Sequence, residues 1–457
     1  MDGLAVGEDA PRVTPLQRRL IIGAGALVFV LLVTGSVFAG ISVGRNAGAH
    51  KVIAPQPTSA TRAVPASEVQ PTAIPTCSLD TLSSAPALIK LYGSVVETAS
   101  GSSLYANNDT TGARPAGVLK ILTAAAAVSV LGPTFQITTR VDDGSTPGTI
   151  VLVGQGDATL SATGHSVYAG APTLSNLASM AVTKYNFTHP GVPINNIVLD
   201  SSYWDPTDNW DSSVSRSLQT GGYLSLATAL QVDGDRQNPA AQVSPRSNDP
   251  ITAAGHAFLT ALSAAPGAQV AGSVTLTKGQ SQGGATVLAS VQSQPVSTLV
   301  KQMLAQNDDT LAEMLARIVS VKESLGGTGG SIQQAMITAL GKYGLDASGL
   351  TMEDGSGESD ETLIPPLFMS KFMSLVSQKG SGLQYVGAGL ASAGKYVGKS
   401  GTISDGAALS GYMTAADGTG ESFTFFAEGA NITSAAQPAL AALANAVYAC
   451  GKNITNN

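Results

Sequence analysis

The amino-acid sequence predicts an α+β fold, in which a body of helices and strands is interrupted by an inserted β-rich domain. Three observations indicate this class. A strand hairpin precedes the first apolar helix, a series of short β-type runs follows it, and helical periodicity then returns before a last group of strands. With 457 residues, the chain is long enough for two or three domains.

The N-terminal part of the chain is expected to hold a membrane anchor that precedes the folded body. Leu20–Val43 contains no charged residue and would span ~36 Å as a helix, compared with ~30 Å for the hydrocarbon core of a bilayer. Because arginines precede this run, the positive-inside rule predicts a cytoplasmic tail over residues 1–19 and an extracytoplasmic main domain. A cleaved signal peptide is the alternative, with a cleavage site at Val37–Ala39. The length of the run favours an uncleaved, single-pass anchor in the cell membrane.

The region after the anchor predicts a spacer and the start of the folded part. Residues 44–76 are rich in Pro, Ser and Thr and predict a semi-extended linker. The two cysteines, Cys77 and Cys450, stand at the two edges of the folded region, and in an exported protein we expect a disulfide between them. Two free buried thiols are the alternative. The four histidines are scattered without ligand spacing, so we predict neither a metal nor a cofactor.

The first half of the folded region predicts strands around one helix. Residues 88–109 are interpreted as two short strands joined by a Ser/Gly turn, and residues 112–131 as a loop followed by an apolar helix. Between residues 133 and 295, Gly, Asn and Asp separate short β-type runs, and Gly222–Leu230 is interpreted as one of these strands. One helix, over residues 249–267, interrupts them.

The second half predicts helices followed by strands. Pro295–Val321 has apolar residues at helical spacing, with a break in the pattern near Asn307. Three strand-like runs then occupy residues 396–432, and a last helix carries Cys450. The sequence therefore predicts a main domain formed by residues 77–132 and 296–457.

Charge and composition exclude one class of partner. Charged residues make up 12% of the chain, the net charge is −7, and no block of Lys and Arg occurs. Because binding to phosphates requires a clustered basic surface, we expect no nucleic-acid partner.

Three short segments carry the residues that suggest chemistry. Lys120 is a lone cation in an apolar helix, which is costly unless the charge is paired or used. In order and separation, Gly117–Lys120, Asn307–Asp309 and Lys399–Thr402 resemble the S-x-x-K, S-D-N and K-T-G elements of penicillin-binding proteins and serine β-lactamases.

The resemblance extends to one family, the class C low-molecular-mass penicillin-binding proteins, which are D-alanyl-D-alanine carboxypeptidases and endopeptidases of peptidoglycan metabolism. Six segments match in order: "PAGVLKILTAAAAV", "LVGQGDATLS", "ALQVDGDR", "MLAQNDDTLAEMLAR", "DGSGES" and "GKSGTISDGAALSGYM". The resemblance implies a transpeptidase fold of the penicillin-binding and serine β-lactamase type, with a β-rich domain inserted at residues 133–295 between the first and second motifs.

The resemblance also implies a role for each position. The residue at position 117 would be the nucleophile and Lys120, one helical turn later, its base. The second element would relay the proton to the leaving group. Lys399, Ser400 and Thr402 would bind the substrate carboxylate, and the backbone N–H after Gly401 would form an oxyanion hole with that of residue 117.

Three positions depart from the family pattern. Gly117 has no side chain where the family has its serine, and Asn307 and Asp309 replace the Ser and Asn of the second element. We expect Asp309 to pair with Lys120 and to hold it protonated, which removes the base. The S-x-x-K pattern occurs once elsewhere, at Ser392–Lys395 in a Gly/Ala-rich loop, and is interpreted as chance.

These departures predict a pseudoenzyme of the serine-type carboxypeptidase family. The loss of a serine nucleophile costs on the order of 10⁶ in turnover. The protein is then expected to bind peptidoglycan stem peptides or cell-envelope proteins. Two alternatives remain open. One is an active D-Ala-D-Ala carboxypeptidase with a relocated nucleophile, and the other is a purely structural protein with a vestigial cleft.

Overall fold

The structure is a computed structural model that describes residues 76–455. The predicted tail (1–19), the anchor (20–43) and the linker up to residue 75 lie outside the described residues. Between residues 76 and 455, no helix is both long and apolar enough to cross a bilayer. The described residues group into one compact unit, so the predicted domain boundaries at 132/133 and 295/296 stay a prediction.

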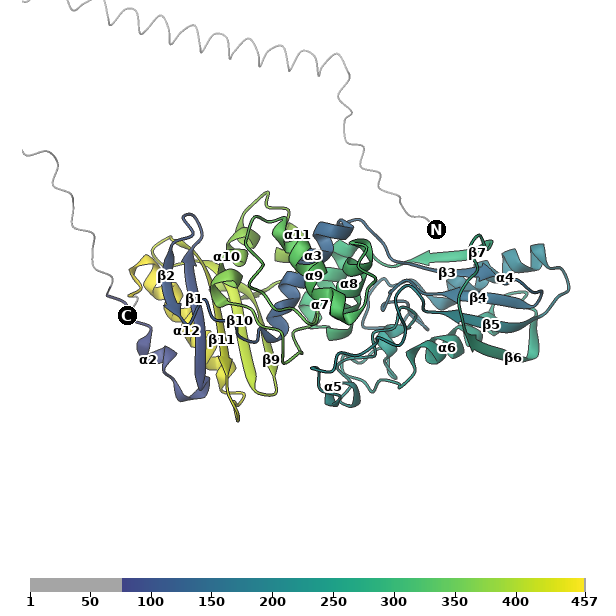
Figure 1. Cartoon of the computed structure of the whole chain (residues 1–457), viewed down its shortest axis with the longest axis horizontal. Coiled ribbons are helices and arrows are strands. Elements are labelled where there is room, and N and C mark those ends of the chain that lie inside the picture. Colours follow the sequence, from purple (N-terminus) through teal and green to yellow (C-terminus); the bar gives the residue numbers. More distant parts are fainter. Residues whose placement is uncertain (1–75, 456–457) are drawn as a thin grey trace, which may run out of the picture. The chain divides into compact units, whose positions relative to one another are not determined.

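A six-stranded antiparallel sheet organises the first and last parts of the described chain (Figure 1). In spatial order its strands are β2 (Ser103–Asn107), β1 (Lys90–Glu97), β11 (Gly420–Glu428), β10 (Gly406–Thr414), β9 (Tyr396–Ile403) and β8 (Ala391–Ala393). The N-terminal hairpin thus pairs with the C-terminal strand, with Lys90 opposite Glu428 and Glu97 opposite Glu421. The sequence analysis predicted the hairpin and the three late strands, and the structure confirms them.

Both faces of this sheet are buried, which explains its apolar strands. Val95, Phe423 and Phe425 face α12 (Ala436–Cys450). The alternate residues, among them Phe426, belong to the core formed with the other helices. Successive side chains of a strand point to opposite faces of the sheet. A sheet that is covered on both faces therefore needs apolar residues at successive positions.

A group of helices forms the middle of the described structure (Figure 1). In sequence, these helices come from two stretches, one before and one after the strands of a second sheet. The members of the group are η2 (Ala116–Leu119), α3 (Lys120–Leu131), α7 (Val296–Gln306), α8 (Asp309–Lys322), η4 (Gly329–Ser331), α9 (Ile332–Gly341), α10 (Pro366–Ser377) and α11 (Gln384–Gly387). Helix α3 contacts α7, α8 and α9, and it is buried along most of its length. The short elements α2 (Asp80–Ser83), η1 (Pro86–Leu88) and η5 (Gly451–Asn453) lie near the chain ends.

The segment between α3 and α7 forms the second sheet. Its strands, in spatial order, are β6 (Val270–Lys278), β5 (Ile194–Asp200), β4 (Thr149–Val153), β3 (Thr138–Asp143) and β7 (Val287–Gln292). Strands β4, β5 and β6 are parallel to one another, and β3 is antiparallel to its two neighbours. The helical elements here are α4 (Leu174–Thr188), α5 (Ser217–Thr220), η3 (Asp233–Asp235) and α6 (Pro250–Ala264).

The prediction of a strand at Gly222–Leu230 was wrong. This segment is irregular because its backbone donors find side chains and loop carbonyls instead of a neighbouring strand. The N–H of Ser225 donates to Thr310 Oγ1 at 3.1 Å, and the N–H of Leu230 donates to Ser201 Oγ at 3.1 Å.

The structure also contains a long helix, α4, that the sequence analysis did not predict. Thr173 caps its first turn by accepting from the N–H of Asn176 at 3.3 Å. Leu174, Leu177 and Ala181 recur at helical spacing and pack on the second sheet. Polar residues between these positions made the region resemble a loop between strands.

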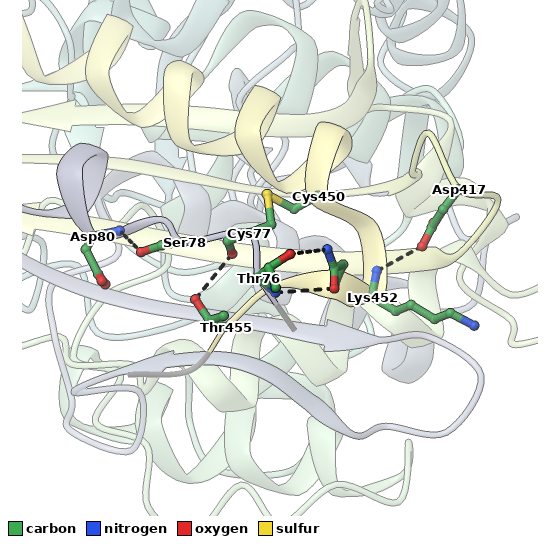
Figure 2. The surroundings of a disulfide bond; sticks show 9 residues. Thr76, Cys77, Ser78, Asp80, Asp417, Cys450, Lys452 and Thr455 are labelled. Atoms are coloured by element: carbon green, nitrogen blue, oxygen red, sulfur yellow. Dashed lines mark hydrogen bonds between the residues drawn. A yellow bond between two sulfur atoms is a disulfide. The ribbon is translucent and has the colours of Figure 1, made fainter. Parts of the chain in front are cut away.

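The two ends of the described chain are joined covalently. Cys77 and Cys450 form a disulfide with their Cα atoms 5.6 Å apart (Figure 2). The backbone N–H of Cys77 donates to the carbonyl of Asn453 at 3.1 Å, and Thr455 Oγ1 donates to the carbonyl of Cys77. The bond thus holds the segment before β1 against the end of α12.

Removal of this disulfide is expected to destabilise the protein. The bond closes a loop of 373 residues in sequence, and removal of a native disulfide typically lowers the free energy of unfolding by about 2–5 kcal/mol. The double variant Cys77→Ser/Cys450→Ser should unfold at lower urea concentration than the oxidised wild type, and the reduced wild type should match the variant. Equal midpoints for all three samples would contradict the prediction.

Candidate functional site

The three predicted elements meet at the head of α3. A β-carbon added to Gly117 would lie 2.5 Å from Asn307 Oδ1, and one added to Gly401 would collide with the backbone nitrogen of Gly117. Gly117 therefore lies between the second element and strand β9. The structure brings the three elements to one place, although they are almost 300 residues apart in sequence.

Local geometry fixes the backbone that leads into Gly117. Arg114 forms ion pairs with Asp360 at 2.9 Å and with Asp405 at 2.7 Å, so the loop before α3 is tied to two other loops. Ala116 has φ 46°, in the left-handed region that non-glycine residues rarely adopt. The chain then makes one 3₁₀ turn, η2, before α3 begins at Lys120.

Lys120 is fully buried and paired. Its Nζ lies 2.6 Å from Asp309 Oδ1 and donates to the carbonyl of Ser356 at 2.8 Å. Burial disfavours the ammonium form and is the largest single effect, but the charges of Asp309, Glu358 and Asp354 together outweigh it, and the pKa of Lys120 lies above its ordinary value. No hydroxyl of the described residues forms a hydrogen bond with this ammonium. The pairing with Asp309 thus favours the protonated ammonium form of Lys120.

Asn307 occupies the space where a side chain at position 117 would project. It ends α7 with φ 52°, a left-handed conformation that Asn tolerates better than most residues. The break near Asn307 that the periodicity predicted is therefore present. The amide oxygen of Asn307 accepts a hydrogen bond from Lys399 Nζ at 2.8 Å. Because Gly117 has no side chain, this amide fits beside it without a collision.

Lys399 is the second buried cation of the site. Its side chain is 8% exposed, and its Nζ also donates to the carbonyl of Leu304 at 3.2 Å. Burial and the nearby charge of Lys120 lower the pKa of Lys399 to about 7. Between residues 76 and 455 no carboxylate forms an ion pair with it. Among the described residues, Lys399 therefore has hydrogen-bond acceptors and no ion-pair partner, although the negative charge of Asp309 acts on it from a greater distance.

Asp308 holds the break between α7 and α8 in place. Its carboxylate caps α8 by accepting from the N–H of Leu311 at 2.9 Å. It also lies 2.8 Å from Arg236 and accepts from Tyr168 Oη at 2.8 Å. Arg236 and Tyr168 come from the segment between α3 and α7. Through these two contacts, that segment holds Asp308 and thereby the positions of the residues on either side of it. The sequence analysis named the segments that contain Arg236 and Asp308 but gave neither residue a role.

The "DGSGES" segment supports Lys120 from the opposite side. The sequence analysis named this segment as one of the six that carry the family resemblance. Asp354 Oδ2 accepts from Ser356 Oγ at 2.8 Å and from the N–H groups of Gly357 and Glu358 at 2.7 Å. This arrangement points the carbonyl of Ser356 toward Lys120 Nζ. Gly357 has φ 86°, and a β-carbon there would collide with the carbonyl of Ala116.

An open cleft of about 770 Å³ lies beside β8 and β9. Asn307, Lys399 and Ser400 line it, whereas Gly117 and Lys120 do not. Thr402 is exposed on the same strand. The described residues that line the cleft thus include the ammonium of Lys399 and the hydroxyl of Ser400.

The second S-x-x-K pattern does not join this cluster. Ser392 lies in the short strand β8, and Lys395 follows in the turn before β9. The Lys395 ammonium lies 4.5 Å from the centre of the Tyr448 ring, which is on α12. Its cation is therefore engaged on another part of the surface.

Comparison with known proteins agrees with this geometry. The fold and the three converging elements define a class C low-molecular-mass penicillin-binding protein. The model of the D-Ala-D-Ala carboxypeptidase 3 (S13) family matches residues 76–237 and 225–447, and the chain belongs to this family. Its place is therefore in peptidoglycan metabolism.

Two relatives and one solved structure illustrate the match. Carboxypeptidase DacB of Mycolicibacterium smegmatis is 30% identical, over 96% of this chain and 99% of the relative. Carboxypeptidase Rv3627c of Mycobacterium tuberculosis is 28% identical, over 74% of this chain and 73% of the relative. Penicillin-binding protein 4 of Haemophilus influenzae has the same fold, with a TM-score of 0.64 and 17% identity over 79% of this chain and 96% of that one. The predicted fold is thereby confirmed.

The buried charge of Lys399 predicts a pH-dependent stability. Its pKa is about 7 in the folded protein and ~10.4 in an unfolded chain, so the unfolded state binds more protons between these values and stability rises with pH. Lys399→Met removes this dependence, whose slope is at most about 1.4 kcal/mol per pH unit. The variant should gain stability relative to wild type at pH 6–7 and lose that advantage by pH 10.

Urea unfolding at several pH values measures the difference. Lys379→Met, at an exposed position, is the matched control and should follow wild type throughout. A constant difference between wild type and Lys399→Met from pH 6 to pH 10 would contradict the assignment.

Proposed function

We propose that this protein is a membrane-anchored, extracytoplasmic and catalytically impaired member of the carboxypeptidase family that binds peptidoglycan peptides without cleaving them. The main observation in support of this proposal is that another side chain fills the space beside Gly117. There the Asn307 amide stands where a nucleophile would project, and it is hydrogen-bonded to Lys399. The N-terminal run Leu20–Val43 is the proposed anchor.

The state of Lys120 supports the loss of catalysis. Acyl transfer by a serine requires a base that can accept the hydroxyl proton within hydrogen-bond reach. The ammonium of Lys120 is paired with Asp309 at 2.6 Å, so it has no free electron pair to accept a proton. Nucleophile and base are thus both missing, and restoring one alone leaves the reaction without the other.

The state of Lys399 supports retained binding. A buried ammonium without a carboxylate partner, beside an open cleft, favours a ligand that brings its own negative charge. The hydroxyl of Ser400 lines the same cleft and can donate a second hydrogen bond. A peptide that ends in D-Ala-D-Ala provides such a carboxylate. Cell-envelope proteins that present a C-terminal carboxylate fit the same chemistry.

Covalent labelling by a β-lactam tests the loss of catalysis. Wild type should form no adduct detectable by intact-protein mass spectrometry. Gly117→Ser alone should also form none, because its side chain meets Asn307 and Lys120 stays paired with Asp309. The triple variant Gly117→Ser/Asn307→Ser/Asp309→Asn restores all three family residues and should become labelled.

Two results would argue against this proposal. An adduct on wild type would establish a relocated nucleophile, and peptide mapping would then identify it. D-Ala release by Gly117→Ser alone would show that Asn307 and Asp309 do not impair the reaction.

Calorimetric titration tests the binding role. Wild type should bind an N-acylated D-Ala-D-Ala peptide, and Lys399→Ala should weaken binding by about tenfold or more, since a hydrogen bond to a charged group contributes ~1.5–3 kcal/mol. Lys379→Ala, away from the cleft, should bind like wild type. Undetectable binding to wild type would reject the binding role and favour a vestigial cleft.

A further inference from the structure

The cleft beside β9 contains a second lysine that the family motifs do not include. Lys301 lies on α7 and lines the cleft together with Lys399. Among the described residues that line the cleft, these two are the charged ones, and none is Asp or Glu. A cleft lined by charges of one sign attracts ligands of the opposite sign.

Lys301 is available for a ligand. Its side chain is exposed, and in the described part of the chain it takes part in no hydrogen bond or ion pair. The backbone around it is well supported, because a β-carbon at Gly389 would lie 3.2 Å from the Lys301 Cα. The loop with Gly389 thus packs against the helix at the base of this lysine.

The two lysines lie within reach of one ligand. Lys399 Nζ donates to the carbonyl of Leu304, which is three residues after Lys301 on α7. Three residues correspond to ~4.5 Å along a helix axis. A ligand bound at Lys399 that extends by about one helical turn along α7 therefore passes Lys301.

The remaining walls of the cleft are largely apolar. Leu390, Tyr396, Leu409 and Pro438 contribute them. Such walls accept the uncharged part of a peptide and provide no anion that would compete for the two ammonium groups. The cleft therefore combines an apolar surface with two cationic positions.

We propose that this cleft selects peptides with two negative charges, in which a C-terminal carboxylate binds at Lys399 and Ser400 and a side-chain carboxylate binds at Lys301. This inference rests on the proposed function, because it assumes that the cleft binds peptides that end in D-Ala-D-Ala. It adds a specificity-determining residue on α7. An uncharged amide in place of the second carboxylate would lose the contact with the Lys301 ammonium.

Matched pairs of peptides test the proposal. N-acetylated tetrapeptides that end in D-Ala-D-Ala carry Glu at the first or the second position, and each has a counterpart with Gln. In low salt, wild type should bind at least one Glu peptide about fivefold more tightly than its Gln counterpart, as expected for an exposed ion pair. Lys301→Met should abolish this preference and bind the Gln peptide like wild type, while Lys379→Met should keep it.

Each other outcome argues against the inference. Equal affinity of wild type for Glu and Gln peptides at both positions overturns the second subsite but leaves the proposed function intact. If Lys301→Met still prefers Glu peptides to Gln peptides, the preference comes from another group, and the proposed subsite is overturned. Failure of wild type to bind any of the four peptides overturns both the proposed function and the inference.

Discussion

The site depends on the buried ion pair between Lys120 and Asp309. A fully buried ammonium is stable only when an opposite charge and hydrogen-bond acceptors surround it. Asp309 provides the charge at 2.6 Å, and the carbonyl of Ser356 provides a further acceptor. The turn at Asp354 and the start of α8 are both arranged around this pair. The same contact that neutralises the buried charge also favours the protonated form of Lys120, so in the proposed function the stability of the core and the loss of the base have one cause.

This pairing leaves the second lysine without an ion-pair partner in the described part of the chain. Asp309 is paired with Lys120, and the hydrogen bonds of Lys399 Nζ go to the amide oxygen of Asn307 and the carbonyl of Leu304. The absence of a side chain at Gly117 makes room for that amide. The three departures from the family pattern are therefore structurally coupled. Under the proposed function, they would turn a site for acyl transfer into a cationic cleft that binds peptides.

The segment between α3 and α7 contributes to the site without touching the cleft at Lys399. Through Arg236 and Tyr168 it holds Asp308, which caps α8 and separates Asn307 from Asp309. Three successive residues, Asp233–Asp235, have positive φ and form the turn that leads into Arg236. The role of this segment is positional, because a buried carboxylate between an arginine and a tyrosine allows little movement of the chain around it.

The sequence by itself determined the elements with strong local patterns. These are the hairpin before α3, the late strands, the break near Asn307 and the absence of a side chain at Gly117. Periodicity and residue identity are properties of neighbouring positions, so they can be read along the chain. The tertiary structure alone decided that residues 222–230 are irregular, that the Asn307 amide fills the space beside Gly117, and that Lys301 and Lys399 share one cleft. Each of these depends on packing between segments far apart in sequence, which no local pattern records.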